Sequence, residues 1–392
     1  MEAVQHCGTT VILFALTFGY MRQRTRVAQL AGSLLLVSLL FSSCQVGRFI
    51  YYNFANITDY KIFPSRPLTG SSAPFRFPQS SRPNVPNALT AIAPTEQAVE
   101  QFLKDNKTVA FLVIHRDSIQ YERYFNGYEE SSTVASFSMA KSVTSMLVGC
   151  AVEDGLIKSV EEPLTNYLPQ LKQNGLENVT IRHLLQMTSG IEFNESYVNP
   201  FGHAASFYYG RNLRKSIAKL KPEVAPGTRF QYISGNTQLL GAVLEKALAG
   251  KTITTYLQEK LWGPMGMEYD ASWSLDKKKD GLEKTFCCLN ARARDFAKLG
   301  RLYLKQGNWN GKQLIPASWV QESTKIDTTQ GSAWHYQYQW WFPSNQGDYM
   351  MQGILGQYVY VNPAKDLIIV RLGKDYGDAG WPGLFTRIAA KY

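Results

Sequence analysis

The segment Ser136-Phe137-Ser138-Met139-Ala140-Lys141-Ser142-Val143-Thr144-Ser145-Met146-Leu147 decides both the fold and the chemistry expected of this chain. Its Ser138-x-x-Lys141 spacing places the two side chains on one face of a helix, about one turn apart. The hydroxyl and the amine can then share a proton, which activates an alcohol as a nucleophile. Apolar and small residues fill most of the segment from 139 to 152, which predicts a helix buried on most sides.

The same serine–lysine spacing occurs twice more, at Ser216/Lys219 and at Ser274/Lys277. Both of those lysines belong to basic stretches, which are usually solvated. Lys141, by contrast, is the lone charge in an apolar run. A lysine that extends its amine to solvent from the first turn of a core helix is the simpler alternative to a catalytic role.

Residues 1–44 have the pattern of a secretion signal. Arginines at 22, 24 and 26 precede an apolar stretch over 30–41, and Phe41-Ser42-Ser43-Cys44 is a small-residue cleavage site that ends in cysteine. This pattern resembles a bacterial lipoprotein signal with Cys44 as the lipidated first residue. A plain membrane anchor or an uncleaved signal is the alternative, and each of these predicts a membrane-attached protein outside the cytoplasm.

Seven of the seventeen prolines lie between residues 64 and 94. Residues 45–94 are therefore expected to form an extended tether, and the folded domain is predicted over 95–392. Within it, β-rich runs at 110–115 and 119–124 indicate a hairpin, short helices and loops fill about 150–285, and a long amphipathic helix follows 290. Strand-like runs at 357–362 and 367–372 complete one sheet that both ends of the domain build.

Several classes of function have no support in the sequence. The formal charge is +10, but no helix-turn-helix, zinc-finger or basic-aromatic motif accompanies it, so no nucleic-acid partner is expected. The five histidines lack the spacing of a zinc hydrolase, and no Gly-x-Ser-x-Gly, Walker A or GxGxxG pattern occurs, so neither a metal nor a cofactor is expected. The five cysteines, which include the adjacent Cys287-Cys288, form no disulfide framework.

A second group that could exchange a proton with a serine lies in the stretch from Pro226 to Asn236. There Tyr232 follows a turn and precedes an apolar helix. Because the chain contains twenty-two tyrosines, a purely structural Tyr232 is the default expectation from composition.

Five motifs together resemble the serine β-lactamase-related family, in the order in which that family carries them, and most closely its branch of 6-aminohexanoate-dimer hydrolases and related esterases. They are Ser138-x-x-Lys141, Asp154-Gly155-Leu156-Ile157, His183-Leu184-Leu185-Gln186-Met187-Thr188-Ser189-Gly190, Pro226-Gly227 before Tyr232-Ile233-Ser234, and Leu261-Trp262-Gly263-Pro264-Met265-Gly266-Met267.

The resemblance implies an α/β fold of the β-lactamase/transpeptidase type, an antiparallel sheet flanked by helices plus an all-helical lobe. It further implies that Ser138 is the acyl-forming nucleophile, that Lys141 lowers the proton affinity of Ser138, and that Tyr232 carries the proton to the leaving group. The family builds its oxyanion hole from the nucleophile's own N–H and from one N–H of a C-terminal strand, which here falls within residues 351–357.

The chain departs from the family pattern at two places. Ser234 stands where β-lactamases of this class carry asparagine, although a serine there is similar to the 6-aminohexanoate-dimer hydrolase branch. No Lys-Thr-Gly triplet occurs, and the region where it belongs reads Met350-Met351-Gln352-Gly353-Ile354-Leu355-Gly356-Gln357. Without that lysine and hydroxyl, recognition of a β-lactam carboxylate is not expected. A carboxylesterase or amidase acting on a small-molecule ester or amide is therefore favoured. A DD-peptidase or penicillin-interacting enzyme and a catalytically silent binding protein are the alternatives.

The other conspicuous residues are two polar residues expected to be structural and a group of aromatic residues with two possible roles. Asp295 and His183 are expected to be structural. Aromatic residues crowd the C-terminal half and either wall an apolar acyl pocket or belong to the core; they are Trp334, Tyr336, Tyr338, Trp340, Trp341 and Trp381.

We expect the mature chain to begin at lipidated Cys44. Mass spectrometry of the membrane fraction should find a lipid-modified cysteine at the new N-terminus, because the segment that precedes it has the pattern of a lipoprotein signal. Cys44→Ala should abolish that modification. An unmodified, uncleaved Cys44 in the wild-type protein would contradict the prediction.

Overall fold

A computed structural model describes residues 29, 45–52, 54–81 and 87–392. The predicted signal over residues 1–44, including Cys44, lies outside the described residues except for residue 29. Helix α2 (Gln45–Tyr52) falls in a different compact unit from Ala55–Tyr392, which contains the strands and helices described below. Within the described ranges, no helix has the length and apolar character needed to cross a membrane.

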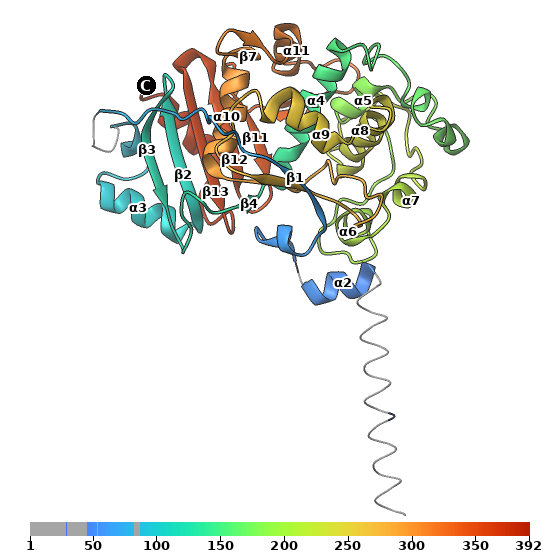
Figure 1. Cartoon of the computed structure of the whole chain (residues 1–392), viewed down its shortest axis with the longest axis horizontal. Coiled ribbons are helices and arrows are strands. Elements are labelled where there is room, and N and C mark those ends of the chain that lie inside the picture. The colour runs from blue at the N-terminus through green and yellow to red at the C-terminus, as the bar shows by residue number, and fades with distance from the viewer. Residues whose placement is uncertain (1–28, 30–44, 53, 82–86) are drawn as a thin grey trace, which may run out of the picture. The chain divides into compact units, whose positions relative to one another are not determined.

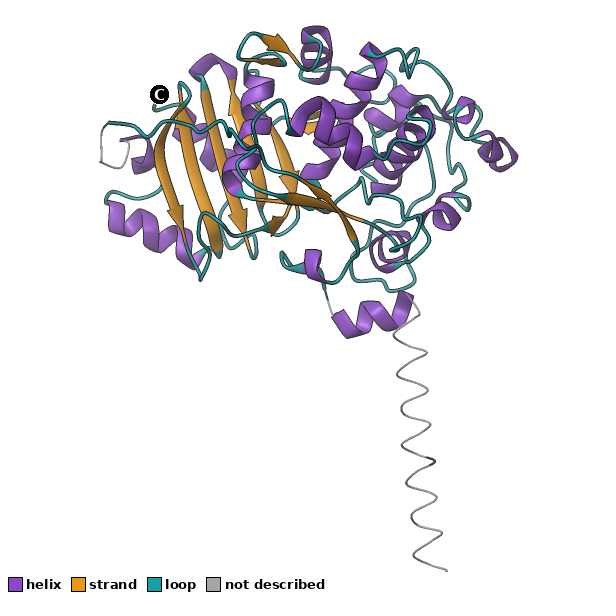
Figure 2. Ribbon diagram, in the orientation of Figure 1, coloured by secondary structure: helices purple, strands orange, loops and turns teal. Residues whose placement is uncertain are grey.

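A seven-stranded antiparallel sheet forms one side of the large unit (Figures 1 and 2). Its strand order is β3-β2-β13-β12-β11-β10-β9, so strands from both ends of the domain meet at its centre. The strands are β2 (Thr108–His115), β3 (Ser118–Tyr124), β9 (Tyr336–Gln337), β10 (Trp340–Trp341), β11 (Tyr349–Gly353), β12 (Gln357–Asn362) and β13 (Leu367–Gly373).

Helices pack on both faces of this sheet and form a helical region beside it (Figure 2). The helices are α3 (Glu96–Asp105), α4 (Met139–Glu153), α5 (Ile181–Leu185), α6 (His203–Tyr209), α7 (Leu213–Ile217), α8 (Ser234–Ala247), α9 (Ile253–Leu257), α10 (Ala293–Leu304), α11 (Ala317–Ser323) and α12 (Trp381–Ala389). Short 3-10 or π turns lie at Asp59–Lys61, Asn87–Ala91, Leu164–Asn166, Pro169–Asn174, Gln258–Trp262 and Pro363–Lys365.

The side chains of β13 alternate between two buried clusters, one on each face of the sheet. Leu367 and Ile369 belong to one buried cluster, together with residues of α3 and α12, whereas Ile368 and Val370 belong to the main core, together with residues of α10 and α4. Successive side chains of a strand point to opposite faces. Because both faces are buried, residues 367–370 are all apolar. The buried Arg371 that follows donates hydrogen bonds to Thr108 Oγ1 and to the Gly356 carbonyl oxygen.

A smaller antiparallel sheet and a short hairpin complete the unit. The smaller sheet has the order β1-β5-β6-β4. Its strands are β1 (Ser65–Leu68), β4 (Val134–Ala135), β5 (Ala271–Ser274) and β6 (Leu289–Ala291), and the hairpin is formed by β7 (Asn308–Trp309) and β8 (Lys312–Gln313).

The predicted arrangement of a sheet built from both ends of the domain, with helices between, is confirmed. The predicted hairpin is also present: β2 and β3 are joined through Arg116 and Asp117, whose φ angles of 50° and 61° are those of a tight hairpin turn.

The prediction of an extended tether over residues 45–94 is wrong for the described part of 55–94. Strand β1 pairs with β5, with Leu68 opposite Ala271, and the side chains of Leu68, Phe77 and Leu89 are buried. Prolines favour extended backbone, and an extended chain is also what a strand needs. The proline count fits the extended backbone of β1 but does not show whether the segment packs, and two 3-10 turns lie in the same segment.

Leu68→Ala should lower the free energy of unfolding by about 2–5 kcal/mol, because Leu68 is only 1% exposed and its removal leaves a cavity. Leu156→Ala is the matched control, because Leu156 is 36% exposed; its effect should stay within about 0.5 kcal/mol. Chemical denaturation monitored by tryptophan fluorescence measures both. Equal effects of the two variants would mean that residues 65–68 do not pack against the domain.

Candidate active site

A tight turn presents Ser138 at the start of helix α4. Phe137 is buried and has φ 45°, which is uncommon for a residue with a large side chain. Ser138 follows as the N-cap of the helix with near-helical backbone angles, φ −64° and ψ −6°. Ser138 is partly exposed, whereas its neighbours Phe137 and Met139 are buried. The turn thus makes one hydroxyl accessible at the end of a buried helix.

The prediction of a buried helix over this segment is confirmed. Helix α4 begins at Met139 rather than at Ser138, and residues 139–151 are all buried. Because the backbone of Ser138 is already near-helical, Ser138 and Lys141 still share one face, as the spacing predicted.

Lys141 is 1% exposed, and its amine is surrounded by oxygen atoms. The Nζ atom lies 3.4 Å from Ser138 Oγ, 3.0 Å from Ser234 Oγ and 2.9 Å from the carbonyl oxygen of Phe286. These oxygens come from the start of α4, the start of α8 and the loop before β6. Lys141 therefore does not reach solvent, and the alternative of a snorkelling lysine is wrong.

Burial lowers the pKa of the Lys141 amine to about 8, and the nearby Glu195 carboxylate opposes this shift. Desolvation penalises a charged ammonium more than a neutral amine. A substantial share of Lys141 is therefore neutral near pH 8. A neutral amine has a lone pair, so it can accept a proton from the adjacent Ser138 hydroxyl.

Tyr232 lies beside both the serine and the lysine. Its side chain is hydrogen-bonded to that of Ser138, and the Lys141 Nζ is 5.2 Å from the centre of its ring. Burial raises the pKa of the Tyr232 hydroxyl above its usual range, the bond to Ser138 opposes this, and the Glu195 carboxylate adds to it. The structure therefore brings all three predicted site residues together, with Tyr232 as a neutral phenol.

Glu195 belongs to the same network, although the sequence did not single it out. Its Oε2 accepts a 2.7 Å hydrogen bond from the Ser234 backbone N–H, and its Oε1 accepts a 2.6 Å bond from the Ser234 hydroxyl. The hydroxyl of Tyr197 also donates to Oε1, at 2.8 Å. Ser234 lies 39 residues away in the chain. Such a separation leaves no local pattern that could have pointed to Glu195.

The end of strand β11 lies against the serine. A Cβ atom on Gly353 would come within 2.4 Å of the Ser136 carbonyl oxygen and 3.2 Å of the Ser138 backbone nitrogen. Only glycine allows this approach without movement of the backbone. The strand end predicted to complete an oxyanion hole, within residues 351–357, thus lies beside the Ser138 N–H.

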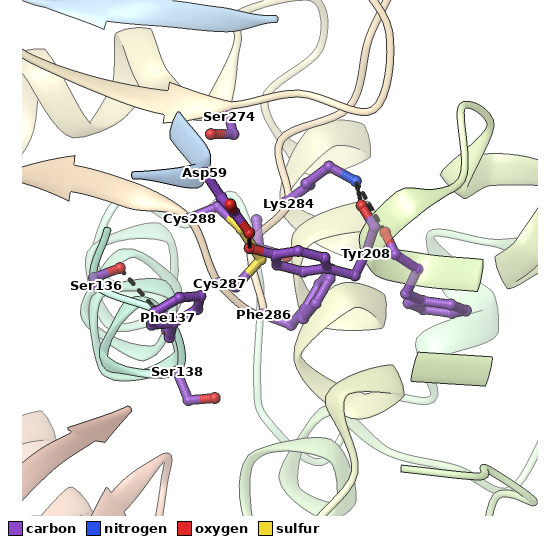
Figure 3. Close-up of a disulfide and its surroundings, with 12 residues drawn as sticks. Asp59, Ser136, Phe137, Ser138, Tyr208, Ser274, Lys284, Phe286, Cys287 and Cys288 are labelled. Atoms are coloured by element: carbon purple, nitrogen blue, oxygen red, sulfur yellow. Dashed lines mark hydrogen bonds between the residues drawn. A yellow bond between two sulfur atoms is a disulfide. The ribbon is translucent and has the colours of Figure 1, made fainter. Parts of the chain in front are cut away.

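The adjacent Cys287 and Cys288 are joined by a disulfide. Both are buried, and Figure 3 shows them next to Phe286, whose carbonyl contacts Lys141. The indole of Trp273 donates 3.0 Å bonds to the Cys287 and Lys284 carbonyls. The sequence predicted no disulfide framework, and this pairing of neighbours closes no larger loop; instead it fixes the segment that holds the acceptor for the lysine.

The crowded aromatic residues divide into two groups. Tyr336, Tyr338, Trp340 and Trp381 are fully buried, which confirms the core reading for them. Trp334 is 47% exposed and lines a hollow of about 600 Å³ together with Ile326, Ser344 and Asn345. Ring contacts run from Trp334 through His335 and Trp341 to Tyr232, with centroid distances of 5.6, 5.9 and 5.2 Å. The hollow is thus connected to the site by a series of ring contacts, of which the one between His335 and Trp341 is stacked.

The remaining candidates are structural, as predicted. Asp295 is buried and accepts bonds from Lys298 and from the Glu268 and Tyr269 backbones. His183 contributes to the capping box of α5 with Thr180. Of the other two serine–lysine pairs, Lys219 is exposed and Lys277 partly exposed. In the described ranges, no group of three or more potential ligands could hold a metal.

Comparison with known proteins shows the family of the chain. Residues 95–390 match the sequence profile of the Beta-lactamase family. The chain belongs to the beta-lactamase family. It is 27% identical over 321 residues to a 6-aminohexanoate-dimer hydrolase of Paenarthrobacter ureafaciens, an alignment that covers 76% of this chain and 79% of that protein.

Solved structures give the same assignment. A putative 6-aminohexanoate-dimer hydrolase from Bacillus anthracis superposes with a TM-score of 0.75 at 26% identity, covering 85% of this chain and 92% of that one. A family VIII carboxylesterase shares the fold, with a TM-score of 0.62 at 16% identity and coverage of 79% and 98%. The predicted family, the branch resemblance and the β-lactamase/transpeptidase-like fold are therefore confirmed, and the chain is related to hydrolases.

Proposed function

We propose that this protein is a serine hydrolase that cleaves a small-molecule ester or amide through an acyl-serine intermediate. The observation that carries the proposal is the contact of a partly exposed serine with a buried amine whose pKa is lowered to about 8. Perturbed titratable groups beside a nucleophile are typical of catalytic sites. This arrangement favours an enzyme over a silent binding protein on the same fold.

In the proposed acylation step, neutral Lys141 accepts the proton of the Ser138 hydroxyl as Oγ attacks the substrate carbonyl carbon. The negative charge that develops on the carbonyl oxygen is stabilised by the Ser138 N–H and by a backbone N–H at the end of β11. When the bond to the leaving group breaks, Tyr232 donates its proton to that group and is reprotonated by the Lys141 ammonium. Water then attacks the acyl carbonyl carbon while neutral Lys141 accepts its proton. The bond between that carbon and Ser138 Oγ breaks, the Lys141 ammonium returns the proton to Oγ, and the carboxylic acid leaves.

The raised pKa of Tyr232 supports this division of roles. A phenol that stays protonated is a poor resting base but a suitable proton donor to a leaving alkoxide or amine. Lys141, which loses its charge near pH 8, is the better base. The serine proton therefore goes first to the amine rather than to a tyrosinate.

The charges of the site bear on the substrate. The hydrogen-bonded network holds one amine, Lys141, and one carboxylate, Glu195. Lys141 is occupied with the serine, and the Lys-Thr-Gly triplet is missing from the strand end at Gly353. A substrate carboxylate would thus meet the negative Glu195 without a dedicated cation, so we infer that the substrate is a neutral ester or amide.

We also propose that the protein acts outside the cytoplasm as a lipoprotein, which the pattern of residues 22–44 supports.

Ser138→Ala, Lys141→Ala and Tyr232→Phe should each lower kcat by about three orders of magnitude or more, measured with p-nitrophenyl esters. Because the three groups would act as one unit, the double variants should lose little beyond the single ones. Tyr232→Phe is the sharpest test, since it removes one oxygen and keeps the ring.

The matched controls are the lysines of the other two serine–lysine pairs. Lys219→Ala and Lys277→Ala should leave kcat within about twofold, because solvated surface changes rarely matter. A folded Tyr232→Phe variant with near-full activity would mean that Tyr232 is structural. A folded Ser138→Ala variant that still hydrolyses esters would contradict the proposed nucleophile.

Short-chain p-nitrophenyl esters should be hydrolysed at least about a hundredfold more efficiently than nitrocefin or penicillin G, compared as kcat/KM. The expected reason is the missing cation for the β-lactam carboxylate. Efficient nitrocefin hydrolysis would overturn the substrate class while leaving the nucleophile in place. Stable labelling by a fluorescent penicillin would instead indicate a penicillin-interacting enzyme.

A further inference from the structure

The Ser234 hydroxyl lies between the buried amine and the Glu195 carboxylate. Its oxygen is 3.0 Å from Lys141 Nζ and 2.6 Å from Glu195 Oε1. Ser234 is 2% exposed, so solvent does not compete for these bonds. A hydroxyl has one proton to donate and two lone pairs with which to accept. An ionised carboxylate is an acceptor only, so the single Ser234 proton points to Glu195.

We propose that Glu195 is a positioning residue that orients the Ser234 hydroxyl. In this orientation the Ser234 oxygen accepts an N–H bond from Lys141, and the lone pair of the Lys141 amine is directed at Ser138. This role rests on the proposed function, which it deepens by adding a residue that sets the direction of proton transfer. Glu195 acts through Ser234 and does not touch the reacting atoms.

The hydrogen count supports the proposal. A neutral lysine amine has two N–H donors and one lone pair. The carbonyl oxygen of Phe286 can only accept, and the Ser234 oxygen, with its own proton committed to Glu195, accepts as well. Both N–H bonds of Lys141 are then used, and the lone pair is directed at the third oxygen, Ser138 Oγ. If the Ser234 proton were free to turn, it could instead donate to the lone pair and block the base.

Capping of helix α8 explains only part of this geometry. Ser234 is the first residue of α8, and the N-cap residue Ile233 makes no side-chain capping bond. A carboxylate that accepts from the Ser234 N–H satisfies one free donor and favours the helix dipole. This cap uses Oε2, however, whereas Oε1 accepts from the Ser234 hydroxyl, which a cap does not require.

Glu195 also sets the charge around the base. The groups that face Lys141 are Ser138 on its own helix, Tyr232 and Ser234 at the start of α8, the Phe286 carbonyl, and the Glu195 carboxylate from the loop after α5. Among them Glu195 supplies the negative charge that raises the pKa of Lys141 against the effect of burial. Loss of that charge should make Lys141 neutral at lower pH.

The test measures the rate at which a fluorophosphonate labels Ser138, and kcat/KM for a p-nitrophenyl ester, between pH 6 and 10. In Glu195→Gln, both rates on the alkaline plateau should fall about tenfold or more, because the base is misaligned. The acid limb of the pH–rate profile, along which the rate rises as Lys141 loses its proton, should move to lower pH by about one unit. Glu195→Asp keeps the charge, so its limb should stay near the wild-type position.

Glu192→Gln is the matched control. Glu192 lies three residues earlier in the same loop and has an exposed side chain. The labelling rate, kcat/KM and acid limb of the Glu192→Gln variant should therefore remain those of the wild type. Ser234→Ala supplies the second measurement. If Glu195 acts through Ser234, adding Glu195→Gln to Ser234→Ala should change the plateau rate less than twofold. A purely structural Glu195 would lower stability without moving the acid limb.

The outcomes separate the two hypotheses. Activity in Ser138→Ala would remove the proposed function itself. Labelling of Ser138 in the wild type, together with an unchanged plateau and acid limb in folded Glu195→Gln, would overturn the positioning role alone. If Glu195→Gln does not fold, the double variant of Glu195→Asp and Ser234→Ala takes its place. Additive effects of these two changes on the plateau rate would overturn the positioning role equally.

Discussion

The burial of one amine, that of Lys141, is the constraint on which the rest of the site depends. Removing an ammonium from water costs several kcal/mol unless hydrogen-bond partners replace the solvent. Here three oxygens replace it, and they come from three segments far apart in sequence. The lysine is therefore tolerated only if α4, α8 and the loop before β6 are all in place. The same desolvation lowers the pKa of the amine to about 8, which makes it useful as a base.

Close packing of backbones brings these segments together. A Cβ atom on Gly241 of α8 would lie 2.2 Å from Thr285 Oγ1, next to the Phe286 carbonyl that receives the lysine. Gly353 allows a similarly close approach between β11 and the backbone of the Ser138 turn. Both glycines lack the side chain that would keep the elements apart. The large antiparallel sheet, covered on both faces, holds β11 in this position.

The surroundings of the lysine bear on both the chemistry and the substrate. Ser234 and Glu195 form a hydroxyl–carboxylate pair at the start of α8, whereas the strand end near Gly353 lacks a Lys-Thr-Gly triplet. The first feature concerns how the nucleophile is deprotonated, and the second concerns which charge a substrate can carry. One fold supports different reactions through such local side chains, so the function has to be argued from the site rather than from the fold.

The sequence by itself determined the helix of Ser138 and Lys141, the turn before Tyr232, the hairpin around Asp117 and the family, because each depends on local spacing or on motifs in a fixed order. Only the tertiary structure decided that residues 65–68 pair with β5, that Glu195 reaches Ser234, and that Cys287 and Cys288 are joined beside the lysine's carbonyl acceptor. Proline content reports backbone shape and not packing. Contacts across many residues leave no periodic signal in one sequence, so the partners of a buried charge become visible only when the chain has folded around it.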